Sequence, residues 1–314
     1  MKKIYTIILV FSLFSCRNYH GNNIHPIQRL ENYNGNVVLP IEERLLTTPI
    51  TITNLLNELD NVDIYSSYEL NDDEKQLFMN YFGFLPLEYK NIFYEKVVGI
   101  YFINNFLGGG MTLPVFDNNG NMYMTLFFNP EILKQNISEW INFRDNSIFE
   151  NNGNRISVVI ECNNTYYAII HTLLHEASHV YDFYNHVTPP RNRETALPTD
   201  FTNGIWNSYN LPIERFDFTN RQNMAFYIFG EKIGKEYAFD MYTALTHTPF
   251  SSLYGSTTWI EDFAEAFTWY YLNKNYGINY VTLLLENDTI LLSYNPNENG
   301  LVKNRYKIFE KIME

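Results

Sequence analysis

Residues 166–184 read YYAIIHTLLHEASHVYDFY, and this stretch decides how the rest of the chain is interpreted. Its apolar residues recur at helical spacing and predict a long helix from about Tyr166 to Tyr184. The preceding Asn163, Asn164 and Thr165 can cap its start. Apolar residues surround the polar ones, so we expect this helix to be largely buried.

The helix contains the pattern H-E-x-x-H, formed by His175, Glu176 and His179. Residues four apart on a helix lie on one face, so both imidazoles can bind one cation. The carboxylate between them lies next to that cation and can take a proton from water. The alternative is two exposed surface histidines. The apolar neighbours argue against it, because buried histidines need partners.

A third histidine, His171, lies one turn before His175. It is either a further ligand or a group that packs beside the ligands and supports them. A catalytic zinc site needs three protein ligands and an open position for water, so another residue must complete the set.

The candidates for the third ligand lie in residues 259–267, WIEDFAEAF. Glu261 and Glu265 are four apart on a predicted helix. Phe263 and Phe267 form an apolar stripe beside them, and carboxylates so close to apolar groups are costly unless they are paired or bind a metal. The alternative is a solvated helix start whose acids lie at the positive end of the helix. Together with H-E-x-x-H, the pattern favours a metal ligand here.

Composition excludes several other functions. The chain has 314 residues, 46% hydrophobic and 18% charged, which is typical of one large or two modest globular domains. A net charge of −13 argues against a nucleic-acid partner. Seven histidines without a His-rich tract argue against metal buffering or transport. Two cysteines cannot form a disulfide scaffold, and Cys162 reads as a buried small residue rather than a nucleophile.

The first sixteen residues have the features of a bacterial export signal. Lys2 and Lys3 precede an apolar stretch that is too short to cross a bilayer as a helix. Leu13-Phe14-Ser15-Cys16 resembles a lipobox, although Phe14 is bulkier than the usual residue. We therefore expect a signal peptide over 1–15, lipidation of Cys16 and a flexible tether over 16–36; the alternatives are plain secretion and an uncleaved anchor. The protein would be extracytoplasmic and held on the bacterial membrane at the cell surface.

The remaining patterns predict an α+β chain. Besides the long helix, helices are expected at residues 71–82, 87–95, 222–245, 261–276 and 301–312. Strands are expected at residues 97–104, 111–116, 122–128 and 155–162. The second and third strands form a hairpin around Asn119-Gly120, and Pro114 places the first arm at a sheet edge. Residues 186–222 and 246–258 are expected to be irregular.

Two segments carry a family resemblance. HEASHVYD, residues 175–182, and YGSTTWIEDFAEAF, residues 254–267, resemble the metalloprotease domain of anthrax lethal factor and the Pro-Pro endopeptidases, which are gluzincin-type zincins. Outside these motifs the match is loose and extends over residues 85–280. It implies a zincin-like metallopeptidase domain over 37–314. Such a domain has a small mixed sheet with an edge hairpin, an active-site helix and a mainly helical C-terminal part.

The resemblance also assigns roles. It implies that His175, His179 and Glu261 bind Zn²⁺ and that Glu176 is the general base. Tyr254 corresponds to a tyrosine that steadies the oxyanion or assists the leaving group. Glu265 corresponds to an acid that orients a zinc-binding histidine.

The sequence departs from the family pattern at two points, which affect the expected substrate specificity more than the expected zinc binding. Ser178 stands where glycine is common, and His179 and Glu261 are 82 positions apart, a longer spacing than expected.

The implied activity is that of a zinc endopeptidase anchored at the cell surface. Its substrate would be a peptide or protein, and a preference for proline-rich sequences rests on analogy alone. An edge strand in residues 108–128 would suit an extended peptide. The rival hypothesis is an inactive zincin-fold lipoprotein that serves as a binding or adhesion module.

Overall fold

The computed structural model describes residues 24–150, 155–162, 165–190, 198–227 and 231–314. The expected signal peptide, the expected lipidation site Cys16 and the expected caps Asn163 and Asn164 lie outside the described residues. No described helix is both long enough and apolar enough to cross a bilayer. The chain divides into two compact units, Met1–Lys134 and Gln135–Glu314.

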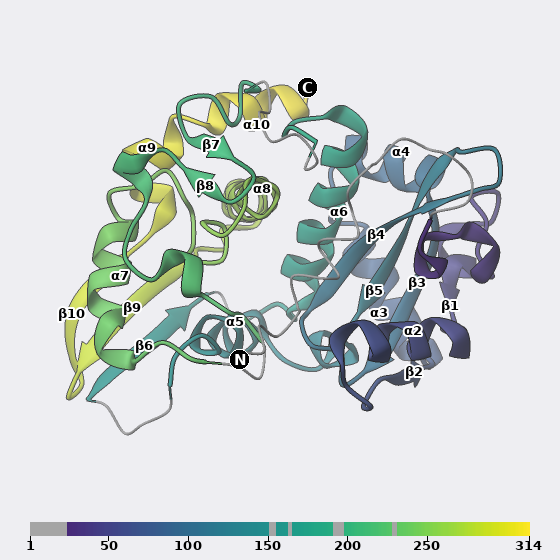
Figure 1. Cartoon of the computed structure of the whole chain (residues 1–314), viewed down its shortest axis with the longest axis horizontal. Coiled ribbons are helices and arrows are strands. Elements are labelled where there is room, and N and C mark those ends of the chain that lie inside the picture. Colours follow the sequence, from purple (N-terminus) through teal and green to yellow (C-terminus); the bar gives the residue numbers. More distant parts are fainter. Residues whose placement is uncertain (1–23, 151–154, 163–164, 191–197, 228–230) are drawn as a thin grey trace, which may run out of the picture. The chain divides into compact units, whose positions relative to one another are not determined.

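The first unit is built on a mixed five-stranded sheet (Figure 1). Its strands are β1 (Leu45–Leu46), β2 (Ser66–Tyr68), β3 (Val97–Asn104), β4 (Gly110–Phe116) and β5 (Met122–Phe128). The order is β1-β3-β5-β4, and β2 also pairs with β3. β1 and β5 run parallel to β3, whereas β4 runs antiparallel to β5. The predicted hairpin is confirmed, and β4, which carries Pro114, lies at the edge.

Three helices accompany this sheet: α2 (Ile50–Asp60), α3 (Asp72–Phe82) and α4 (Leu87–Lys96). The two predicted helices, α3 and α4, are confirmed. Asn71 and Glu74 form a reciprocal capping box at the start of α3, because each side chain bonds the backbone N–H of the other. α2 was not predicted, since its first residues are β-branched and disfavour a helix in isolation.

The packed part of the first unit begins before residue 37. Ile27 is 1% exposed and Tyr33 is 7% exposed, and both belong to the core that packs against the sheet. The Tyr33 hydroxyl donates a hydrogen bond to the carbonyl of Ile27. The tether predicted for residues 16–36 therefore extends too far along the chain.

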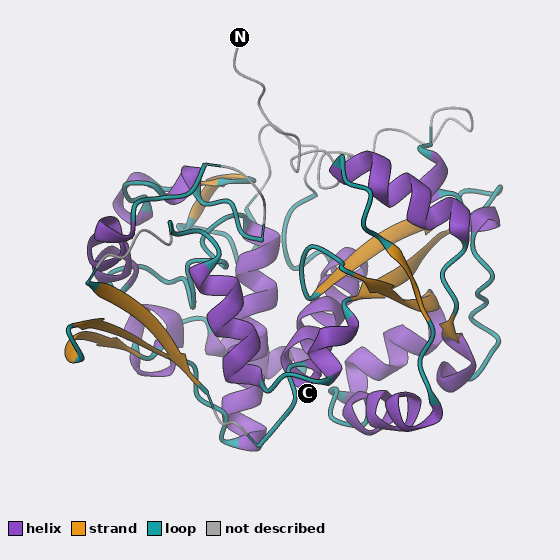
Figure 2. Ribbon diagram, turned by 90° about the horizontal axis from the view of Figure 1, so that it is seen from below, coloured by secondary structure: helices purple, strands orange, loops and turns teal. Residues whose placement is uncertain are grey.

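The second unit contains a three-stranded antiparallel sheet, ordered β10-β9-β6, and six of the nine described α-helices. Figure 2 distinguishes helices and strands by colour. Its helices are α5 (Ile137–Asn146), α6 (Ile169–Asn185), α7 (Ala238–Leu245), α8 (Trp259–Tyr276), α9 (Gly300–Lys303) and α10 (Tyr306–Ile312). Its strands are β6 (Ile156–Glu161), β7 (Trp206–Ser208), β8 (Leu211–Pro212), β9 (Val281–Glu286) and β10 (Thr289–Tyr294). Helices α6 and α8 pack against each other, and α5 and α7 contact the sheet.

Several predicted boundaries in this unit are wrong. The helix predicted for 222–245 is reduced to α7, because Tyr227 has a positive φ of 63° and breaks the helical path. The long helix begins at Ile169 rather than Tyr166. The helix predicted for 301–312 is two helices separated at Asn304 and Arg305. The hairpin of β9 and β10 was not predicted, so the C-terminal part is less helical than expected.

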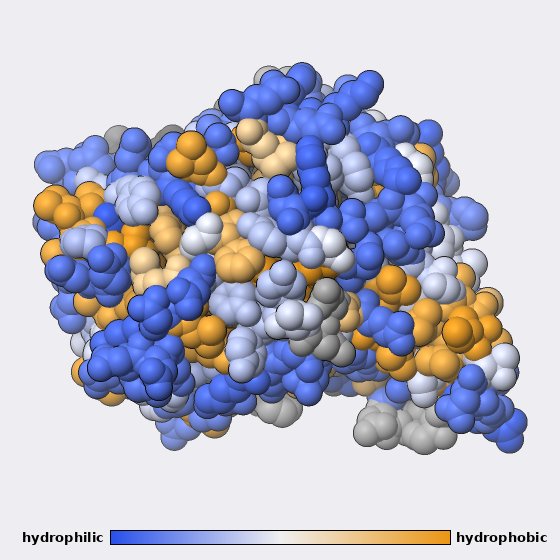
Figure 3. Space-filling model, turned by 180° about the vertical axis from the view of Figure 1, so that it is seen from behind, coloured by the Kyte–Doolittle hydropathy of each residue, from blue (hydrophilic) through white to orange (hydrophobic). Residues whose placement is uncertain are grey.

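The α+β class is confirmed in both units. Large apolar side chains that remain exposed include Val38, Ile50 and Leu87 in the first unit and Phe143 and Ile290 in the second. Figure 3 shows one face on which apolar residues occur in separate patches between hydrophilic ones. Such scattered exposure is ordinary for a protein surface.

Candidate metal centre

Three ligand-type side chains converge between α6 and α8. His175 and His179 lie one turn apart on α6, and Glu261 lies in the first turn of α8. The Nε2 atom of His175 is 3.1 Å from Oε2 of Glu261 and 3.2 Å from Nε2 of His179. The Nε2 atom of His179 is 3.5 Å from the same carboxylate oxygen. One donor atom from each residue thus lies within 4.8 Å of the others, and the group can hold a metal ion.

The local sequence explains this convergence. On α6 the four-residue spacing places both imidazoles on one face. On α8 the Thr258 hydroxyl accepts a hydrogen bond from the backbone N–H of Glu261, at 3.3 Å, and fixes the first turn. The three side chains are buried, with 5%, 8% and 4% of His175, His179 and Glu261 exposed. The expectation that the site helix is buried is therefore confirmed.

The charges of the group are strongly coupled. Burial disfavours a charged imidazole, but the carboxylates of Glu261 and Glu265 outweigh it and raise the pKa of His175 to about 10. Burial likewise disfavours a charged carboxylate. The two imidazoles, His179 above all, outweigh it and lower the pKa of Glu261 to about 2. A proton or a cation therefore binds favourably between these three side chains.

Glu265 lies on the other side of the His175 ring. Its Oε1 atom is 3.2 Å from Nδ1 of His175, at ion-pair distance but without hydrogen-bond alignment. Its Oε2 atom accepts hydrogen bonds from the Ser252 hydroxyl, at 2.7 Å, and from the Trp269 indole, at 3.2 Å. The structure thus places Glu265 where a carboxylate can orient a ligand imidazole.

A second group of ligand-type atoms shares two of these residues. His171, His175 and Glu265 also lie close enough together to hold a metal ion. However, Nη1 of Arg144 donates to Oε1 of Glu265 at 2.8 Å, so a cation bound here would lie beside a guanidinium. The repulsion between like charges in a buried site favours the group of His175, His179 and Glu261.

His171 has a packing role. Burial lowers the pKa of its imidazole to about 4, so the ring is neutral at physiological pH. The ring centroid lies 4.6 Å from that of Trp269. Of the two alternatives left by the sequence, the structure favours packing beside the ligands.

Tyr254 lies close to the same group, and Glu176 is the next residue after His175 in the chain. The Tyr254 ring centroid is 5.8 Å from that of His175. Burial, with the carboxylates of Glu261 and Glu176, raises the pKa of Tyr254 well above its usual value. Its phenol therefore keeps its proton and can donate a hydrogen bond. Glu176 is 4% exposed and follows His175 directly on α6.

Sequence reasoning missed two residues that support the site. Arg144 lies on α5, a helix that was not predicted, and nothing in its sequence neighbourhood distinguishes it from a surface arginine. Ser252 lies in the loop before α8, where its contact with Glu265 depends on the tertiary fold. Neither residue belongs to a motif with a recognisable spacing.

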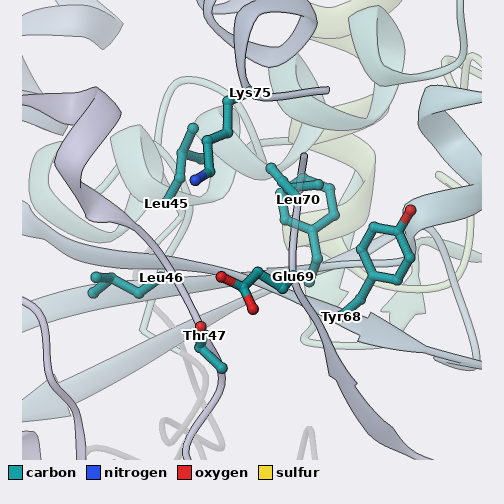
Figure 4. Close-up of a pocket in the computed structure, with 8 residues that line it drawn as sticks. Leu45, Leu46, Thr47, Tyr68, Glu69, Leu70 and Lys75 are labelled. Carbon is teal, nitrogen blue, oxygen red and sulfur yellow. The ribbon is translucent and has the colours of Figure 1, made fainter. Parts of the chain in front are cut away.

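The first unit has a separate pocket (Figure 4). It is lined by Leu45, Leu46, Thr47, Tyr68, Glu69, Leu70, Lys75 and Phe102. This lining contains one carboxylate and no histidine or cysteine, so it does not form a metal-ligand group.

Comparison with known proteins gives no assignment, because no family model, curated protein or solved structure matches the chain.

Proposed function

We propose that this protein is a zinc-dependent endopeptidase. The observation that carries the proposal is the convergence of two imidazoles and a carboxylate, contributed by His175 and His179 on one helix and by Glu261 on another, 86 positions from His175 along the chain. Two histidines and one glutamate are a donor set that suits Zn²⁺ and leaves a coordination position for water or substrate. When bound, zinc polarises the scissile carbonyl and acidifies water.

The protein's own residues supply the proton transfers. Glu176 projects from the same helix as the two histidines and takes the proton of the attacking water. Tyr254, held protonated by its buried surroundings, donates a hydrogen bond to the negative charge that develops on the carbonyl oxygen. Glu265 contacts Nδ1 of the His175 ring, whereas Nε2 of the same ring faces the proposed metal site. These roles are the ones that the resemblance to lethal factor and the Pro-Pro endopeptidases implies.

The proposal extends to location and substrate class. Lipidation of Cys16 would hold the enzyme on the extracytoplasmic side of the bacterial membrane, and the substrate would be an extended peptide segment. Labelling with an alkyne-tagged fatty acid tests the anchor. The native chain should be labelled and a Cys16→Ser variant should not.

The activity is tested by mass-spectrometric profiling of a diverse peptide library. The soluble chain beginning after Cys16 should cut peptides, and Glu176→Gln should keep zinc but lose the cuts. Glu261→Ala should lose zinc affinity. Undiminished cleavage by Glu176→Gln would overturn the general-base role, and unchanged zinc content in Glu261→Ala would exclude Glu261 as a ligand. A zinc-loaded native chain that cuts nothing would favour the binding module.

A further inference from the structure

We propose that Arg144 is a positioning residue of the metal centre, which holds Glu265 against His175 and steadies the ring of Tyr254. This inference rests on the proposed function, because it assigns a role in the same site. No sequence motif points to it. The contacts of one buried guanidinium carry it.

Arg144 lies on α5 and is 2% exposed. Its Nε atom donates to Oδ1 of Asp145 at 2.7 Å, and its Nη1 atom donates to Oε1 of Glu265 at 2.8 Å. Asp145 is held in turn by the Tyr280 hydroxyl, which donates to Oδ2 at 2.6 Å. The guanidinium carbon lies 4.9 Å from the centre of the Tyr254 ring, a cation–π contact.

Charge balance alone does not explain this arrangement. Asp145, the next residue in the chain, already provides one negative charge for the guanidinium. The second carboxylate comes from Glu265, 121 positions away, and Oε1 is also the atom that faces Nδ1 of His175. Nη2 of Arg144 has no hydrogen-bond partner among the described residues. The guanidinium therefore does not make every hydrogen bond that it could make. Its position suits contact with Glu265 and Tyr254.

The contacts define what Arg144 does. Ser252 and Trp269 hold Oε2 of Glu265, but only Arg144 donates an aligned hydrogen bond to Oε1 among the described residues. Without it, Oε1 keeps, among these residues, only the 3.2 Å approaches of His171 Nε2 and His175 Nδ1, neither of which is an aligned hydrogen bond. A misdirected carboxylate orients the imidazole poorly and lowers its basicity, which weakens metal binding.

The same guanidinium acts on two further features. Its charge keeps a cation away from the group of His171, His175 and Glu265, so the ion is confined to the other side of the His175 ring. It also lies over the ring of Tyr254 and restrains the plane in which the phenol can donate. One side chain thereby links metal affinity to the placement of the oxyanion donor.

The test compares Arg144→Lys with a matched control, Arg44→Lys. Lysine keeps the positive charge, but it lacks the planar guanidinium whose separate nitrogens bond Asp145 and Glu265 at the same time. Arg44 is equally buried, at 2% exposed, and donates to backbone carbonyls within the first unit. We expect Arg144→Lys to lower zinc affinity about 10- to 100-fold and to change the visible spectrum of the Co²⁺-substituted protein. It should also lower kcat more than it changes KM. Arg44→Lys should leave affinity and spectrum unchanged.

Zinc affinity is measured by competition with a chromogenic chelator, without substrate. Wild-type affinity and spectrum in Arg144→Lys would overturn the inference, as would an equal loss in Arg44→Lys. If Arg144→Lys does not fold, the double variant Arg144→Met/Asp145→Asn decides, because it removes the guanidinium together with the neighbouring negative charge. A loss of zinc affinity of about 10-fold or more in that variant supports the positioning role, and wild-type affinity overturns it. A wild-type chain without peptidase activity would refute the proposed function while leaving these affinity results readable.

Discussion

Metal binding to this protein should tighten steeply as pH rises through the neutral and mildly alkaline range. His175 has a folded-state pKa of about 10, against an ordinary value of 6.5, because two carboxylates stabilise its charged form. Its Nε2 atom faces both Glu261 and His179, so a proton held there must leave before the nitrogen can bind a metal. Glu261, with a pKa of about 2, needs no deprotonation above acidic pH.

The magnitude follows from the distance between the working pH and that pKa. At pH 7.5 the proton should weaken apparent affinity by roughly 300-fold relative to the limit above pH 10. The logarithm of the association constant should rise by about one unit for each pH unit between about 7 and 9.5, and about one proton should be released per metal bound.

The same pKa shift has the opposite effect on the stability of the metal-free protein, which is obtained by treatment with a chelator. A folded pKa raised above 6.5 gives stability that is fully present below pH 6.5 and is lost as pH rises through about 10. The metal-free protein should therefore lose stability as the pH rises across this range. The metal-loaded protein should not, because the ion takes the place of the proton.

Isothermal titration calorimetry in two buffers of different ionisation enthalpy measures both affinity and proton release. Glu265→Gln should move the steep region to lower pH, because one of the two carboxylates that raise the pKa is neutralised. His186→Asn, an exposed position at the end of α6, is the control and should leave the profile unchanged. An affinity that is independent of pH from 7 to 9.5, with no proton released, would refute the reasoning.

Three further predictions concern stability and reactivity. Arg305 and Asp262 form a buried pair with two 2.7 Å hydrogen bonds, so Arg305→Met should lower the free energy of unfolding by about 3–5 kcal/mol. In denaturant titrations, a loss below about 1 kcal/mol would show that the pair is not effectively buried. Cys162 is half-buried rather than fully buried as its sequence suggested, but desolvation still raises the pKa of its thiol. Iodoacetamide should therefore react with it more slowly at neutral pH than with a free cysteine. An equal rate, followed by mass spectrometry, would contradict this. Asn287 and Asp288, between β9 and β10, have φ values of 48° and 64°, so Asp288→Gly should raise stability by about 0.5 kcal/mol. A lower melting temperature for that variant, measured by calorimetry, would argue against turn strain at this position.

Local patterns predicted the elements that depend on local physics. The capping box at Asn71 and Glu74, strand β3 and the hairpin of β4 and β5 were all recognisable, because their signals lie within a few residues of one another. The pairing of His175 with His179 was visible for the same reason, since helical spacing alone places both on one face.

Features that depend on contacts between distant residues were harder to predict from the sequence. The helix expected over 222–245 fails at Tyr227, whose positive φ is set by its surroundings and leaves no trace in apolar periodicity. Glu261 could be proposed as a ligand only through its motif, because its contact with α6 depends on tertiary packing. Arg144 had no signal at all, since a buried arginine and a surface arginine look alike in sequence.

The sequence separation between the proposed ligands affects the conformational entropy of the chain. His179 and Glu261 are 82 positions apart, so an ion that binds both closes a long loop, as a disulfide would. Closing such a loop restricts an otherwise free chain by about 4–5 kcal/mol in entropic terms. That cost grows only with the logarithm of length, and doubling the loop adds about 0.6 kcal/mol. A change in the length of an exposed stretch between α6 and α8 would therefore alter this entropic contribution little, whereas the buried Phe201, Trp206 and Met241 of the same segment are fixed by packing.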